Sequence, residues 1–171
     1  MSKIPLRIYW DANAWIAYIR KEMPTAENKI KHPRYEMCRE VLRRAENREI
    51  EIATSTFSLS EVCKRRDEAF DPTVNVPAFF DQPYVFLIDV TKAVGLRAQH
   101  LQLSGVGGLK PADATHIASA LIANATVFHT FDGGLLDLGN TLTCASNEQL
   151  RIVLPGKELP MPELLRQMQS G

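Results

Sequence analysis

Four acidic residues along the chain have the side chains and the spacing that a divalent-cation site requires. They are Asp11, Glu61, Asp113 and Asp132. Hard carboxylate oxygens in a cluster suit Mg²⁺ or Mn²⁺ rather than zinc. One or two such ions, partly hydrated, can lower the pKa of a bound water and stabilise charge on a phosphodiester. The predicted chemistry is therefore hydrolysis by an activated water, which needs no Ser, Cys or His nucleophile.

Each of these acids, taken alone, has a second explanation. A carboxylate near a helix N-terminus caps the first turn, and the helix dipole favours it by roughly 0.3–1 kcal/mol. The four together favour a cation site, because they occupy corresponding positions in separate strand–helix units. Carboxylates brought close together raise one another's pKa, and a cation removes that cost.

The elements that must position the acids alternate along the sequence. Hydrophobic runs predict strands at residues 6–10, 49–53, 84–88 and 126–130, with a weaker candidate at 141–144. Helical patterns begin at about residues 11, 33, 58, 91 and 111 and end at about residues 21, 46, 70, 103 and 124. Residues 71–83 are predicted to be irregular, with a short helical turn near 76–80, and Gly133-Gly134 is predicted to break the chain.

Strands separated by helices predict parallel pairing with right-handed crossovers. The predicted fold class is α/β, a three-layer α/β/α sandwich with a central, mainly parallel sheet of four to five strands. In such a sheet, function gathers at the carboxyl ends of the strands. Asp11 and Asp132 follow strands there. Glu61 is expected in about the first turn of the helix after strand 49–53, and Asp113 in the first turn of the helix that begins at Pro111.

Composition limits the classes of protein to consider. The 171 residues fit one domain, predicted at residues 1–154, followed by a Pro-containing C-terminal tail at 155–171. Lys plus Arg number 20, as do Asp plus Glu, so the formal net charge of zero does not indicate a non-specific polyanion binder. The three cysteines form no C-x-x-C pair, and no signal peptide or membrane-spanning run is visible. These features predict a cytoplasmic protein with no membrane association.

Four segments around the acids resemble the acidic motifs of the PIN domain family. They are Tyr9–Asn13, Ser58–Val62, Leu109–Leu121 and His129–Asp132, and the similarity covers about residues 6–150. The third motif is the most specific, because D-A-x-H-x-A-x-A follows an L-K-x-x run. PIN domains are typically Mg²⁺- or Mn²⁺-dependent ribonucleases. Small single-domain members in bacteria and archaea are commonly VapC-type toxins, which a partner antitoxin neutralises.

The resemblance implies an endoribonuclease that hydrolyses RNA phosphodiesters and is the toxin of a toxin–antitoxin pair. It implies an RNA substrate, an antitoxin partner and a homodimer. It assigns both metal binding and catalysis to Asp11, Glu61, Asp113 and Asp132. The same carry-over gives Asn13 and Thr130 supporting roles and makes Asp137 a further candidate acid.

Two other residues near the acids, His116 and Lys110, have two interpretations each. His116 lies three residues after Asp113 and so on about the same helix face, where it could be a base or a metal ligand. A supporting role in packing or hydrogen bonding is favoured, because a metal-activated water needs no imidazole base. Lys110 could contact substrate phosphate or be an ordinary surface lysine. His129, at the end of a buried strand, is predicted to be structural.

Two other functions remain open from the sequence. An aspartyl-nucleophile phosphatase usually has D-x-D after its first strand, and this chain has Asp11-Ala12-Asn13 instead. A non-catalytic PIN-like scaffold that binds RNA or a protein is the main alternative, and the presence of all four acids argues against it.

Overall fold

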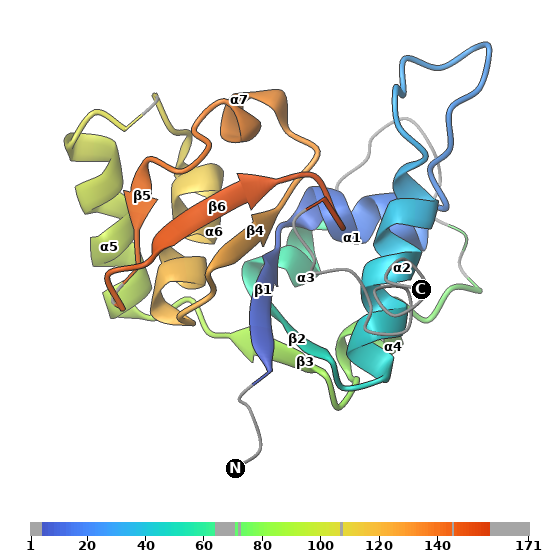
Figure 1. The fold of residues 1–171 in the computed structure, drawn as a ribbon, viewed down its shortest axis with the longest axis horizontal. Helices are drawn as coiled ribbons and strands as arrows, with labels where there is room; N and C mark the ends of the chain where they lie inside the picture. Colours follow the sequence, from blue (N-terminus) through green and yellow to red (C-terminus); the bar gives the residue numbers. More distant parts are fainter. Residues whose placement is uncertain (1–4, 64–70, 72, 107, 145, 158–171) are drawn as a thin grey trace, which may run out of the picture.

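A computed structural model of the chain describes residues 5–63, 71, 73–106, 108–144 and 146–157, and it has the predicted alternation of strands and helices (Figure 1). Its strands are β1 (Leu6–Trp10), β2 (Ile50–Ser55), β3 (Val85–Ile88), β4 (Val127–His129), β5 (Leu142–Thr143) and β6 (Gln149–Val153). Its helices are α1 (Ala12–Ile19), α2 (Arg34–Glu46), α3 (Phe57–Glu61), α4 (Val76–Phe80), α5 (Lys92–Leu103), α6 (Pro111–Ile122) and α7 (Gly133–Leu136).

The strands form one sheet in the order β3-β2-β1-β4-β6-β5. Every neighbouring pair is parallel except β5 and β6, which are antiparallel. The predicted α/β fold with a mainly parallel sheet is therefore confirmed, with six strands rather than four to five. β1 lies between β2 and β4, and Trp10 pairs with His129, so the residues that follow these two strands emerge side by side.

Side chains alternate between the two faces of the sheet, as strand geometry requires. Ile8 and Trp10 of β1 belong to the hydrophobic core beneath α1 and α2, whereas Tyr9 belongs to the core beneath α5 and α6. Figure 1 shows α5 and α6 grouped apart from α1 and α2. Both cores are fully buried, with Trp10 and Trp15 packed edge to face at 4.9 Å between ring centroids. The three-layer α/β/α sandwich is thus confirmed.

Helix starts follow from local chemistry. The Asp11 carboxylate accepts a hydrogen bond from the Ala14 N–H, and Thr91 caps α5 through the Val94 N–H in the same manner. Pro111 occupies the first turn of α6, where a missing N–H costs nothing. Asp11 is thus both a predicted site residue and the N-cap of α1, so the helix fixes the orientation of its carboxylate.

The structure differs from the sequence-based expectation at three elements. β6 is not predicted by the sequence analysis; its residues alternate, with Leu150 and Ile152 buried and the others partly or fully exposed. Gly133-Gly134 begins a short helix, α7, instead of breaking the chain, because Asp132 caps it through the Leu135 N–H. The helix predicted at 58–70 begins at Phe57 and ends at Glu61, and residues 64–70 lie outside the described part of the chain.

Three further features concern the whole chain: its cysteines, its membrane association and its domain boundary. Cys38, Cys63 and Cys144 are free thiols. No helix within the described residues is long and apolar enough to cross a bilayer. The domain boundary predicted at residue 154 stays a prediction, and most of the predicted tail lies outside the described residues.

Candidate active site

Asp11 is the most buried of the four acids, with 2% of its surface exposed. Its Oδ1 accepts from the Ala14 N–H at 2.9 Å, and its Oδ2 accepts from the hydroxyl of Thr130 at 2.6 Å and from the amide of Asn13 at 3.4 Å. Burial raises the pKa of this carboxyl, and the hydrogen bonds act in the opposite direction. An ionised carboxylate offers about four acceptor positions, so these three bonds leave room for a cation.

Thr130 links two of the acids. It lies directly after β4, and the parallel pairing of β1 with β4 brings it beside Asp11. Its hydroxyl donates to Asp11, and the same oxygen accepts from the N–H of Asp132 at 2.9 Å. The predicted supporting role of Thr130 therefore has a direct geometric counterpart. Among the described residues, Asn13, which is exposed, makes only the longer contact described above.

Glu61 comes from a different strand–helix unit and is held by His116. Their Oε2 and Nε2 atoms lie 2.6 Å apart, and His116 is 3% exposed. Glu61 is the last residue of the five-residue helix α3, one turn after β2 ends, rather than within a long helix. Among the described residues, its Oε1 has no hydrogen-bond partner. His116 is thus placed by hydrogen bonding against an acid of the site, as the sequence favours.

Asp113 lies in the first turn of α6, and its carboxylate accepts no hydrogen bond from the described residues. The pKa of its carboxyl is raised, first by burial and then by the negative charge of Asp132, with a smaller contribution from Glu61. Lys110 and His116 oppose this shift. The electrostatics of Asp113 therefore link it to two of the other acids, and mutual repulsion of this kind is what a bound cation relieves.

Three of the acids line one cavity of about 250 Å³, at the carboxyl edge of the sheet. Asp11, Glu61 and Asp113 form its acidic wall, and the rest of its lining is Ala12, Asn13, Ile16 and His116. Asp132 does not line this cavity. It is linked to the cavity residues by its hydrogen bond with Thr130 and by its negative charge, which raises the pKa of Asp113. The structure thus brings three predicted acids together and places the fourth at the margin.

The spacing of the acids limits which metal they fit. Within the described ranges, no group of three His, Cys, Asp or Glu side chains is already arranged tightly enough to hold an ion. Mg²⁺ keeps several waters and needs only one or two direct carboxylates. A cavity with three carboxylates that keep open acceptor positions fits a partly hydrated ion of that kind.

The remaining candidate residues lie farther from the acids. Lys110 is exposed at the N-terminus of α6, and its charge reaches Asp113. Asp137 is exposed at the C-terminal end of α7 and does not line the cavity. His129 is fully buried, its Nδ1 accepts from the indole N–H of Trp10 at 3.1 Å, and burial lowers its pKa to about 3. His129 is therefore a neutral core residue, as predicted.

Tyr9 is a further residue of this site that the sequence does not predict. Its hydroxyl lies 2.9 Å from Nδ1 of His116 and accepts the N–H of Ser55 at 3.0 Å. The feature of the sequence that could have identified Tyr9 is the alternation along β1. It turns Tyr9 toward α6, while its neighbours Ile8 and Trp10 face α1. A buried tyrosine that faces a histidine-bearing helix needs a partner for its hydroxyl.

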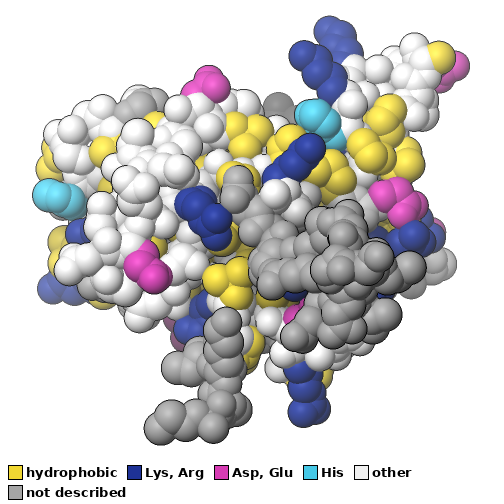
Figure 2. Space-filling view, viewed as in Figure 1, with side chains coloured by type: hydrophobic (Ala, Val, Ile, Leu, Met, Phe, Trp, Pro, Cys, Tyr) yellow, Lys and Arg dark blue, Asp and Glu magenta, His cyan; other side chains and the backbone are white. Residues whose placement is uncertain are grey.

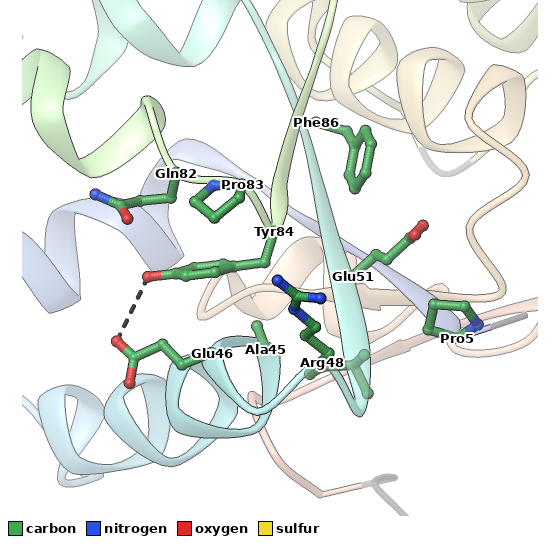
Figure 3. A pocket seen from close by; sticks show the side chains of 10 residues that line it. Pro5, Ala45, Glu46, Arg48, Glu51, Gln82, Pro83, Tyr84 and Phe86 are labelled. Carbon is green, nitrogen blue, oxygen red and sulfur yellow. Dashed lines mark hydrogen bonds between the residues drawn. The ribbon is translucent and has the colours of Figure 1, made fainter.

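A second cavity, of about 420 Å³, lies at the opposite edge of the sheet (Figure 3). Its lining includes Pro5, Ile50 and Tyr84, which stand at the amino ends of β1, β2 and β3. In Figure 3 the Tyr84 hydroxyl points to Glu46, to which it donates a long 3.4 Å hydrogen bond. This cavity contains none of the predicted acids, so its greater volume does not make it the better candidate.

One face of the molecule shows how the charged side chains are distributed. Figure 2 shows one face, on which Lys and Arg side chains are scattered among uncharged and acidic ones instead of forming a basic patch. This agrees with the net charge of zero.

Comparisons with known proteins agree with the geometry. A family model described as the PIN domain matches residues 8–140, more than half of the chain. Among solved structures, the fold is similar to that of VapC20 from Mycobacterium tuberculosis, described as a sarcin-ricin loop cleaving toxin. The TM-score is 0.53 and the identity 20%, over 74% of this chain and 90% of that one, so the likeness concerns the fold alone. No curated protein matches the sequence significantly.

Proposed function

This chain belongs to the PIN domain family, and from that premise we propose that it is a metal-dependent endoribonuclease. The observation that carries the proposal is the acid-lined cavity, in which Asp11, Glu61 and Asp113 meet from three separate strand–helix units. Fold similarity to a protein described as a sarcin-ricin loop cleaving toxin is consistent with it. The substrate class is RNA, and the reaction is hydrolysis of a phosphodiester.

The proposed cofactor is Mg²⁺ or Mn²⁺, held by Asp11, Glu61 and Asp113, with Asp132 at the margin. When bound, such an ion lowers the pKa of a coordinated water and stabilises charge on the phosphodiester. The protein's own contribution is to fix the carboxylates: Thr130 and the Ala14 N–H orient Asp11, and His116 orients Glu61. We propose that Lys110, exposed beside Asp113, contacts a substrate phosphate.

RNA cleavage by purified variants tests the proposal. Asp11→Asn and Asp113→Asn remove a charge with almost no change in shape, so each is expected to abolish cleavage while circular dichroism shows an unchanged fold. A sarcin-ricin stem-loop and total RNA serve as first substrates, because the similar toxin is described as acting on the former. Cleavage by either variant at the wild-type rate would contradict the mechanism.

The main alternative is a non-catalytic scaffold that binds RNA or a protein. Calorimetric titration with Mn²⁺ separates the two functions, because a scaffold should show no Mn²⁺ binding that depends on Asp11. We further propose that the protein is a homodimeric toxin with an antitoxin partner. Growth arrest on expression, relieved by co-expressing a small protein encoded next to this gene, would support that role, and sedimentation would give the oligomeric state.

A further inference from the structure

A chain of hydrogen bonds leads from β2 through the sheet to Glu61. The backbone N–H of Ser55 donates to the hydroxyl oxygen of Tyr9 at 3.0 Å. That oxygen lies 2.9 Å from Nδ1 of His116, whose Nε2 lies 2.6 Å from Oε2 of Glu61. The first three of these residues are buried, so water does not compete for the bonds between them.

The direction of these bonds follows from counting protons. The Tyr9 oxygen already accepts from the N–H of Ser55, so its single hydroxyl proton remains to be donated. Ser119 donates its own hydroxyl proton to the Thr115 carbonyl at 2.8 Å and so is not a donor to Tyr9, whose 2.9 Å contact is with Nδ1 of His116. With Nδ1 of His116 accepting from Tyr9, a neutral imidazole carries its proton on Nε2 and donates it to Glu61.

The ring of His116 is also fixed by packing. Tyr9 meets it edge to face at 5.9 Å between centroids, and Phe57 of α3 lies against it at 5.8 Å. A flip of the imidazole would exchange nitrogens for carbons and lose both hydrogen bonds. The aromatic contacts and the hydrogen bonds therefore select the same orientation.

We propose that Tyr9 and His116 form a positioning pair for Glu61. Tyr9 sets the Nε2–H tautomer of His116, and His116 then holds Oε2 of Glu61 and leaves Oε1 for the cation. The inference rests on the proposed function, since it assigns Glu61 to the metal. Residues that fix the tautomer and orientation of groups at a metal site commonly change metal affinity by 10- to 100-fold when they are mutated. His116 is thus a positioning residue and not a catalytic one.

Nitrogen-15 NMR of the metal-free protein tests the tautomer directly. In a buffer basic enough for histidine to be neutral, the His116 signals, assigned by their loss in His116→Gln, should show a protonated Nε2 and an unprotonated Nδ1. Tyr9→Phe keeps the ring and removes the donor, so it should yield a mixture of tautomers. A protonated Nδ1 in the wild-type protein, or no change in Tyr9→Phe, would overturn the proposal.

Manganese binding by two matched variants tests the consequence. His116→Gln keeps an amide N–H that can reach Glu61, whereas His116→Leu has a similar volume and no donor. We expect Mn²⁺ affinity within a few-fold of wild type for the first and about 10- to 100-fold weaker for the second. Equal losses in both variants, or none in either, would overturn the proposal. If His116→Leu does not fold, the comparison of Tyr9→Phe with wild type replaces it.

Failure of this inference and failure of the proposed function are distinguishable. Wild-type protein that binds Mn²⁺ through Asp11 but leaves RNA intact contradicts the function and leaves the positioning role of His116 standing. Wild-type protein that cleaves RNA with the opposite tautomer contradicts only the positioning role. The tautomer itself is measured without metal or substrate, so it depends on neither result.

Discussion

Thr130 donates a 2.6 Å hydrogen bond to Oδ2 of Asp11, although 119 positions separate the two residues in the sequence. The bond depends on the parallel pairing of β1 with β4, which places the ends of these strands side by side. It orients a carboxylate that is 2% exposed. The orientation of Asp11 in the site therefore depends on the pairing of β1 with β4 at the centre of the sheet.

Replacing Thr130 by valine should weaken both the fold and the site. The variant keeps the shape of the side chain but leaves Asp11 and the N–H of Asp132 short of a partner, at a cost of about 1–3 kcal/mol in the free energy of unfolding. Urea denaturation measures that loss, and titration should show weaker Mn²⁺ binding. Thr130→Ser retains the hydroxyl and is the control. Equal stability of the two variants would show that the hydroxyl contributes nothing.

Divalent cations should stabilise the wild-type fold through the cavity acids. Mn²⁺ at about 100 times its dissociation constant should add about 2.7 kcal/mol to the free energy of unfolding and raise Tm, and a chelator should reverse the effect. Asp113→Asn should lose most of this increase. Asp137→Asn removes an acid of the same type that is exposed and does not line the cavity, so its response should match wild type. An equal response from all three proteins would place the ion elsewhere.

His129 should make the protein less stable in mild acid. Its pKa is lowered from 6.5 to about 3 by burial, so the unfolded chain binds a proton that the folded chain excludes between these values. The stabilisation is complete above the unfolded pKa and is lost as pH falls below it, by about 2 kcal/mol between pH 7 and pH 5.

The same measurement on two variants isolates this effect. His129→Asn retains an acceptor for Trp10 and cannot titrate, so its free energy of unfolding should lose about 2 kcal/mol less than wild type over that interval. His100→Asn changes an exposed histidine on α5 and should leave the wild-type dependence intact. Parallel pH profiles for wild type and His129→Asn would be inconsistent with a buried, neutral His129.

Removing the charge of Lys110 should affect RNA more than metal. Lys110→Ala deletes an exposed cation beside Asp113, so we expect KM for RNA to rise and the slope of log affinity against log salt to fall by about 1. Binding of Mn²⁺ should change little. Arg43→Ala, on the exposed side of α2 and away from the cavity lining, is the control for loss of one positive charge. An identical salt slope in both variants would place the substrate elsewhere.

Sequence patterns predict most of what positions the site. Apolar runs mark β1 and β4, and Asp11 and Asp132 stand just after them, where the helix-cap chemistry of an aspartate and the topology of a parallel sheet agree. Pro111 marks the start of α6 and so places Asp113 in its first turn. These features are local, and short-range chemistry decides them.

The features that the sequence does not predict depend on contacts made after folding. β6 is a short strand in which buried and exposed residues alternate. This burial pattern arises only when the strand lies between β4 and β5 in the folded sheet. Glu61 ends a five-residue helix, and its orientation comes from His116, 55 positions away. The partnership of Tyr9 with His116 likewise spans 107 positions, and no local pattern reports it.

β6 also has a consequence for the order in which the protein is made. The Thr130 N–H is held by the carbonyl of Val153 at 3.2 Å, so the residue that orients Asp11 is itself secured from a later part of the chain. Synthesis proceeds from the N-terminus. A nascent chain that has reached Asp132 carries all four acids but lacks this strand. The growing polypeptide therefore possesses the complete set of acids about twenty residues before it possesses the scaffold that aligns them.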